Sequence, residues 1–161
     1  MSSVVRRITE ADLAAVVELV YELADYEHAV SECHLTVDAL RAALFGEHPV
    51  LFGHVAEAEG EVVGTALWFL NFSTWQGVPG LYLEDLYVRP SHRGGGHGLA
   101  LMAELAAECV RRGYPRFQWQ VLDWNEPSIQ FYRRLGAKPT SEWLGYLLTG
   151  EELVKAAALA H

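Results

Sequence analysis

A short run of glycines carries the clearest chemistry in this sequence. The segment Arg93-Gly94-Gly95-Gly96-His97-Gly98 stands between a β-prone run and an apolar helical pattern. Glycine has no Cβ and readily adopts positive φ, so successive backbone N–H groups in such a turn can face one anion. The start of the following helix adds the positive end of its dipole. These residues predict a site for a phosphate or pyrophosphate group, with Arg93 as a charge-assisted contact.

The known phosphate-binding motifs do not match this run. A P-loop needs Gly-Lys followed by Ser or Thr, and the segment contains none of these pairs. The dinucleotide fingerprint Gly-x-Gly-x-x-Gly fails because, counted from Gly94, its sixth position is Leu99. A flexible surface turn is the alternative interpretation. Four glycines within five residues, directly before a helix, favour the anion site.

The glycine run must be positioned by a strand before it and a helix after it, and the rest of the chain alternates between these patterns. Strands are expected at 4–8, 50–58, 62–70, 81–88, 116–122 and 143–148. Helices are expected at 13–27, 37–45, 99–112, 125–135 and from a capping box at 149–152 onward. Residues 71–80 are expected to form a loop. Hairpin strands followed by strand–helix–strand units favour a mixed α/β sandwich.

Length and composition exclude several classes of protein. The 161 residues suffice for one domain spanning 1–161. A hydrophobic content of 51% excludes a disordered chain, and the net charge of −9 disfavours nucleic-acid binding. No apolar run has the length of a signal peptide or a membrane span. Cys33 and Cys109 are too far apart in sequence for a disulfide framework or a metal motif, which favours a cytoplasmic protein without metal.

Longer segments around the glycine run carry a family resemblance. They are residues 22–27, 45–49, 82–86, 124–129 and 131–137, together with the run from Arg93 to Gly98. That run resembles the Arg/Gln-x-x-Gly-x-Gly/Ala acetyl-CoA motif of the GCN5-related N-acetyltransferases (GNAT). Within this superfamily the chain is similar to the diamine (spermidine/spermine) and thialysine N-acetyltransferases over nearly its whole length. The resemblance implies a mixed, mostly antiparallel sheet that splays at its centre and carries helices on both faces.

The resemblance also implies acetyl-CoA as cosubstrate and assigns its contacts. Pantetheine contacts fall on the backbone of Leu86, Tyr87 and Val88, where one N–H near Val88 would polarise the thioester carbonyl. Pyrophosphate contacts fall on Arg93, Gly94, Gly95, Gly96, His97, Gly98 and Leu99. Further CoA contacts fall on Asn125, Ser128 and Arg134. Tyr132 matches the family's general acid, which would protonate the departing thiolate.

Spacing alone gives Tyr132 a different interpretation. Ile129, Tyr132 and Leu135 share one face of the expected helix, which is typical of a tyrosine packed in a core. The match of the surrounding segment to the family favours the acid role.

An amine acceptor requires a base, and two adjacent carboxylates are candidates. A lysine-type amine has a pKa of ~10.4 and is almost wholly charged at neutral pH. Glu84 is the candidate base, acting directly or through a water molecule. Glu84 and Asp85 should point to opposite faces of their strand unless a bulge intervenes. A solvated edge carboxylate is the alternative for either, but both lie inside an apolar run just before the glycine turn.

The resemblance further implies a pocket for a cationic amine. Its residues would be Tyr26, Glu27, Trp75, Glu84, Asp85, Gln118, Trp119 and Gln120. Gln118 and Gln120 share one strand face opposite Trp119, so at most one set lines the pocket. The diamine enzymes carry an acidic residue where this chain has Ser73, and the following loop is one residue longer here. These departures weaken selection for a polyamine with several charges.

The sequence therefore predicts an acetyl-CoA-dependent N-acetyltransferase for a small cationic primary amine. Direct attack of the amine is expected, because neither cysteine lies in a recognised nucleophile setting. Two alternatives stay open, namely an acceptor that is a protein lysine or N-terminus, and a non-catalytic acetyl-CoA-binding module. No nucleic-acid or membrane partner is expected. A homodimer is expected because members of this group usually form one.

Overall fold

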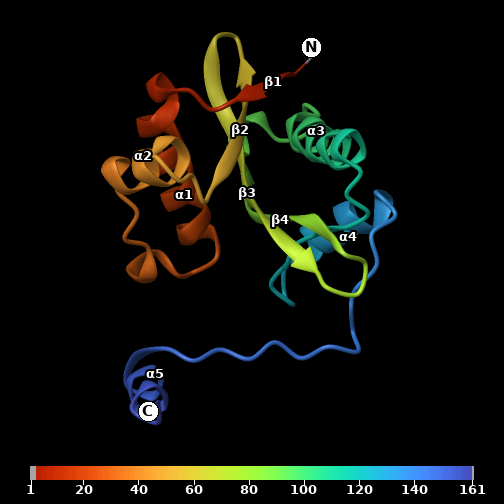
Figure 1. Ribbon diagram of the computed structural model, residues 1–161. Coiled ribbons are helices and arrows are strands. Elements are labelled where there is room, and N and C mark those ends of the chain that lie inside the picture. Colours follow the sequence, from red (N-terminus) through yellow and green to blue (C-terminus); the bar gives the residue numbers. More distant parts are fainter. Residues whose placement is uncertain (1–2, 161) are drawn as a thin grey trace. The chain divides into compact units, whose positions relative to one another are not determined.

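The computed structural model describes residues 3–160 (Figure 1). Its contacts fall into two compact units, residues 1–122 and residues 123–161. No helix among the described residues is both long enough and apolar enough to cross a bilayer.

The first unit is built on an open five-stranded sheet. Its strands are β1 (Val4–Arg7), β2 (Phe52–Ala58), β3 (Glu61–Ser73), β4 (Val78–Val88) and β5 (Phe117–Gln118), and they lie side by side in that order. The first three pairings are antiparallel, and only β4 and β5 run parallel. The expected mixed, mostly antiparallel sheet is confirmed.

Helices cover both faces of this sheet (Figure 1). They are α1 (Leu13–Tyr26), α2 (Val37–Phe45) and α3 (His97–Arg112), with short 3-10 turns η1 (Glu10–Asp12), η2 (Val30–Glu32) and η3 (Pro90–His92). Leu67 of β3 belongs to the buried core formed with α1 and α2. Gly64 of the same strand instead faces Leu101 of α3. Successive side chains of a strand alternate between faces, so an odd spacing puts these two residues on opposite sides.

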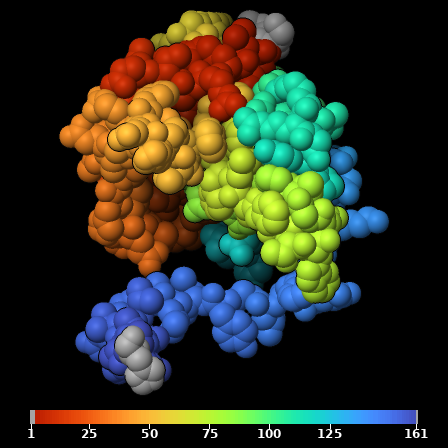
Figure 2. Space-filling view, viewed as in Figure 1, coloured from red at the N-terminus to blue at the C-terminus, as the bar shows by residue number. Residues whose placement is uncertain are grey.

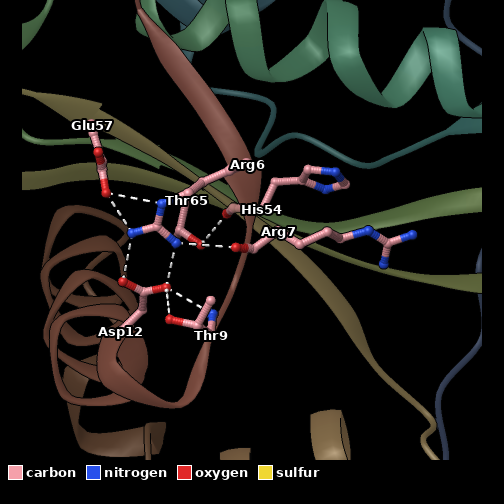
Figure 3. A network of polar contacts seen from close by, with 7 residues as sticks. All are labelled: Arg6, Arg7, Thr9, Asp12, His54, Glu57 and Thr65. Carbon is pink, nitrogen blue, oxygen red and sulfur yellow. Dashed lines mark hydrogen bonds and ion pairs between the residues drawn. The ribbon is translucent and has the colours of Figure 1, made fainter.

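A partly buried ion-pair network fixes the start of the chain against the sheet. Figure 3 shows the Arg6 guanidinium between the carboxylates of Asp12 and Glu57. Arg6 donates to the two Asp12 oxygens at 2.7 and 2.9 Å. The backbone N–H and the hydroxyl of Thr9 also donate to Asp12. The hydrogen bond from Arg6 holds the pKa of Asp12 down to about 2, so this anchor stays charged at physiological pH.

Several expected boundaries in the first unit are wrong. The expected loop at 71–80 is a tight hairpin, because β3 continues to Ser73 and β4 begins at Val78. Helix α3 begins at His97 and not at 99. The strand expected at 116–122 is reduced to the two residues of β5, since only Leu81 and Tyr82 pair with it.

The second unit holds two helices, α4 (Glu126–Arg134) and α5 (Gly150–Ala157). The strand expected at 143–148 is wrong, since these residues have no regular secondary structure. An extended segment becomes a strand only when a neighbour completes its hydrogen-bond ladder, and apolar alternation alone does not supply one. Thr149 stands at the start of α5 as expected, but its side chain accepts no capping hydrogen bond.

Candidate active site

One edge of β4 is unpaired where the candidate residues begin. β5 pairs with β4 only at Leu81 and Tyr82, so within residues 3–160 no strand covers that edge from residue 84 to residue 88. The Arg89 N–H donates to the Val63 carbonyl at 2.9 Å, which fixes the alternation of the ladder with β3. In an antiparallel pair, alternate residues direct N–H and C=O to opposite edges. The backbone polar groups of Leu86 and Val88 therefore face the open edge.

The glycine turn has the shape that an anion requires. Gly94 and Gly96 lie in the left-handed region at φ 83° and 84°. A Cβ at either position would meet no atom within 4 Å, so conformation and not space requires glycine there. Gly96 begins α3 without a side-chain cap, and no acidic residue occupies the first turn. In the part of the chain that the structure describes, Gly96 supplies no side-chain cap, so the first N–H groups of α3 are candidate donors to a phosphate or pyrophosphate.

Two side chains of the turn are held by the protein itself. The Nε of Arg93 donates to the Val88 carbonyl at 2.9 Å. The Arg93 guanidinium carbon lies 5.4 Å from the centre of the Tyr26 ring and 5.3 Å from that of Tyr87. The imidazole of His97 is buried, and its Nδ1 lies 2.7 Å from the Ser3 hydroxyl oxygen. Its Nε2 lies on the side of the turn, since a Cβ added at Gly95 would meet that atom at 3.3 Å, so both the ring and the backbone N–H of His97 stay candidates for an anion contact.

A β-bulge separates the two adjacent carboxylates of β4. Leu67 of β3 lies opposite Asp85, whereas Trp68 lies opposite Leu83, which leaves Glu84 without a cross-strand partner. Glu84 is exposed and Asp85 is half-buried. Sequence spacing allowed for a bulge but gave no sign of its position, because the bulge arises from the pairing with β3.

Three carboxylates gather at this point. Burial, followed by the negative charges of Glu84 and Glu27, raises the pKa of Asp85 to about 6. Burial also raises the pKa of Glu27, which directly follows the last residue of α1. The end of α1 therefore meets β4 in an electronegative patch suited to an ammonium group. The described residues, 3–160, hold no cluster of three His, Cys, Asp or Glu side chains arranged for a metal ion.

The other expected pocket residues are placed unevenly. The Asn71 amide donates to Gln118 Oε1 at 2.9 Å. The sequence did not predict this contact, because Asn71 was expected in a loop and lies in β3. The Trp119 ring packs edge-on against Phe117 with the centroids 4.9 Å apart, and Gln120 is exposed. Trp75 is 92% exposed at the tip of the β3–β4 hairpin, which projects in yellow-green from the first unit in Figure 2. The first unit thus brings together Tyr26, Glu27, Glu84 and Asp85, but not Trp75.

The second unit positions the remaining candidates on α4. Asn125 is buried at the helix start, and its side-chain oxygen accepts the Ser128 N–H at 3.4 Å. Tyr132 is half-buried with its ring centroid 5.5 Å from that of Phe131. Arg134 is exposed in the last turn.

An open mixed sheet, with the β4 edge unpaired beside a glycine turn that opens a helix, is the arrangement expected of an acetyltransferase of the GNAT class. The model of the acetyltransferase (GNAT) family matches residues 17–137. The chain belongs to this family and is an N-acetyltransferase, as its resemblance implied. The family uses acetyl-CoA as cosubstrate.

Named relatives agree with this placement. The chain is 35% identical over 167 residues to the thialysine N-epsilon-acetyltransferase of Mus musculus, covering 97% of this chain and 98% of the relative. It is 37% identical over 92 residues to the L-ornithine N5-acetyltransferase of Arabidopsis thaliana, covering 57% of this chain and 40% of that protein. An integron cassette protein from the mobile metagenome of V. cholerae has a similar solved structure, with 27% identity, a TM-score of 0.81 and 98% coverage of both chains.

Proposed function

We propose that this enzyme transfers an acetyl group from acetyl-CoA to a primary amine of a small cationic substrate, such as a lysine-like or thialysine-like compound, a diamine or a polyamine. The observation that carries the proposal is the placement of Glu84 and Asp85 at the β4 bulge, where the charge of Glu27 from the end of α1 acts on Asp85. The named relatives support it, because thialysine and ornithine each present a primary amine at the end of a short chain.

The cosubstrate site of this proposal follows the open edge into the turn. Acetyl-CoA, when bound, supplies the acetyl thioester. Leu86, Tyr87 and Val88 are the proposed pantetheine contacts, and the alternation of the ladder supports Leu86 and Val88 directly. The free N–H groups at the start of α3 are the proposed pyrophosphate donors. Asn125, Ser128 and Arg134 remain proposed CoA contacts of the second unit.

The carboxylates have two tasks in this proposal. They attract the ammonium form of the acceptor, and one of them takes its proton before attack on the thioester. We assign the proton transfer to Glu84 and Asp85 together, with the exposed Glu84 reached through water. A pKa of about 6 suits Asp85 for this work, because a base is most effective when its pKa lies near the operating pH.

The departing thiolate needs a proton, and Tyr132 is the proposed donor. Attack by the amine is proposed to be direct. Burial raises the pKa of the Cys109 thiol, which keeps this group protonated and a poor nucleophile.

The acceptor is proposed to lie against Tyr26, with Gln118, Trp119 and Gln120 as further contacts. Trp75 gains no support from its exposed position. Ser73 stands where the diamine enzymes carry an acidic residue, which favours an acceptor with one or two charges.

We further propose that both units form one catalytic domain, that the chain is a homodimer and that it works in the cytoplasm. The family model supports the first point, because its match runs across the boundary at residue 122. The homodimer is supported by exposed apolar side chains in the second unit, among them Trp143, Tyr146 and Leu147, which are 74%, 94% and 83% exposed. The free Cys33 and Cys109 are compatible with a reducing compartment.

The deciding experiment measures thiol release from acetyl-CoA with thialysine, lysine, ornithine, putrescine, spermidine, an aminoglycoside and a lysine-containing peptide. The proposal expects turnover with at least one small amine, and kcat/KM that rises with pH toward the pKa of the amine. Turnover confined to the peptide would replace the small acceptor with a protein. Binding of acetyl-CoA without turnover of any amine would refute the proposal.

A further inference from the structure

Arg93 joins three elements of the first unit at one point. It belongs to the turn before α3, its Nε donates to the Val88 carbonyl of β4 at 2.9 Å, and its guanidinium carbon lies 5.4 Å from the ring centre of Tyr26. The ring of Tyr87 lies at 5.3 Å from the same atom. Tyr26 is the last residue of α1, so the arginine connects the end of that helix to the strand.

The end of α1 is a place where a nearby cation is favourable. The helix has no basic residue in its last turn, although the carbonyl groups there carry the negative end of its dipole. His28, two residues after Tyr26, lies in the left-handed region at φ 59° and ends the helix. Its N–H donates to the Asp25 carbonyl at 3.0 Å and the Ala29 N–H donates to the Ala24 carbonyl at 2.8 Å, so local hydrogen bonds hold this turn and Arg93 adds a contact from outside it.

The end of α1 carries Tyr26 and Glu27, which are proposed contacts of the acceptor amine. Glu27 follows Tyr26 directly, and its charge acts on Asp85. We propose that Arg93 is a positioning residue for the acceptor amine, which holds Tyr26 and Glu27 against β4 beside Asp85. The proposal rests on the proposed function. It differs from a direct contact to the pyrophosphate, which the motif position alone implies.

The two roles give opposite kinetic results. We expect Arg93→Met to raise KM for the acceptor about tenfold, the effect of losing two cation–π contacts and one hydrogen bond. The Kd of coenzyme A by calorimetry should change less than about twofold, since backbone N–H groups supply the anion site. Arg93→Lys should recover most of the acceptor KM, because an ammonium group can also contact the rings and the Val88 carbonyl.

Arg89 offers a matched control. It also connects α1 to the end of β4, but through ion pairs with Glu18 and Glu22 at 3.2 Å each, which lie earlier in the helix than Tyr26. We expect Arg89→Met to leave the acceptor KM within about twofold of wild type. Equal effects of both variants would overturn the specific role of Arg93.

A second measurement keeps the test independent of turnover. The Glu27 N–H donates to the Leu23 carbonyl and the Ala29 N–H to the Ala24 carbonyl, so their hydrogen exchange reports on the end of α1. Exchange of these two amides should be faster in Arg93→Met and unchanged in Arg89→Met. Unchanged exchange in Arg93→Met, or a weakened Kd for coenzyme A with a normal acceptor KM, would overturn the proposal. If wild type acetylates no amine, the proposed function fails, and the exchange result still decides the role of Arg93.

Discussion

Replacing Asp85 by asparagine should stabilise the enzyme at neutral pH while it impairs catalysis. The pKa of Asp85 is raised from 3.8 to about 6, so the folded protein resists ionising this carboxyl. Each pKa unit corresponds to 1.36 kcal/mol, so the shift costs on the order of 3 kcal/mol once the group is charged. An asparagine side chain has a similar shape and no charge. The same change should lower kcat/KM by about tenfold or more, because it removes a proton acceptor.

The stability difference between Asp85→Asn and wild type depends on pH, because the unfolded and the folded wild type lose the Asp85 proton at different pH values. Below about pH 4 both states are protonated and the variant gains nothing. Between about pH 4 and 6 the unfolded chain ionises first, so wild type loses stability relative to the variant as pH rises. Above about pH 6 the difference stays constant, because both states are then ionised.

The pH dependence of wild-type stability does not isolate Asp85, because His54 changes the free energy of unfolding with pH in the opposite direction. Burial lowers the pKa of His54 to about 4, so its contribution is present above its ordinary pKa of 6.5 and is lost as pH falls toward 4. The two slopes oppose each other between pH 4 and 6, and only the difference between Asp85→Asn and wild type isolates Asp85.

Urea unfolding of both proteins at intervals from pH 4 to pH 8 provides the measurement. Glu84→Gln is the companion variant, since it removes one negative charge that raises the pKa of Asp85. In this variant the loss of stability caused by ionisation of Asp85 should be centred at a lower pH than in wild type. A difference between wild type and Asp85→Asn that does not vary with pH would refute the assignment of a raised pKa. The assignment would also be refuted if the stability of wild type rose relative to that of the variant with increasing pH.

Three further predictions concern the turn, the acid and the dimer. Gly96→Ala should raise the Kd of coenzyme A about tenfold by calorimetry, because alanine resists φ 84°. Gly60→Ala, at φ 81° in the β2–β3 turn, is the control: it should cost about 1 kcal/mol of stability in urea and leave that Kd unchanged. Tyr132→Phe should lower kcat by about 10² or more with coenzyme A binding intact, and unchanged turnover would remove the acid role. Leu147→Glu should convert a dimer to a monomer in light scattering, whereas Val110→Glu, at a position that is 80% exposed in the first unit, should not. A monomeric wild type would refute the dimer proposal.

The sequence predicted those features that depend on local chemistry. The helix at 37–45 has the expected limits because Thr36 caps its start and Gly46 follows its end. The glycine turn was predicted from its four glycines and its place between a strand and a helix, and the two positive φ values confirm its conformation. Family resemblance added the class of enzyme and the type of sheet.

Features that depend on pairing between distant segments were not predicted. The bulge at Glu84 exists only because β3 and β4 shift register between Leu67 and Trp68. Arg93 has its contacts because the fold brings the end of α1, 67 positions earlier in the sequence, beside the turn. Neither hydrophobic periodicity nor turn chemistry carries this information.

The unpaired edge of β4 affects more than ligand binding. A strand that leaves amide and carbonyl groups free along one side is a template on which another chain can add, which makes it a starting point for aggregation. Arg93 blocks one of these groups by occupying the Val88 carbonyl. If acetyl-CoA binds along this edge as proposed, it covers more of the same groups, so the cell's supply of the cosubstrate would protect this protein from aggregation as well as feed its reaction.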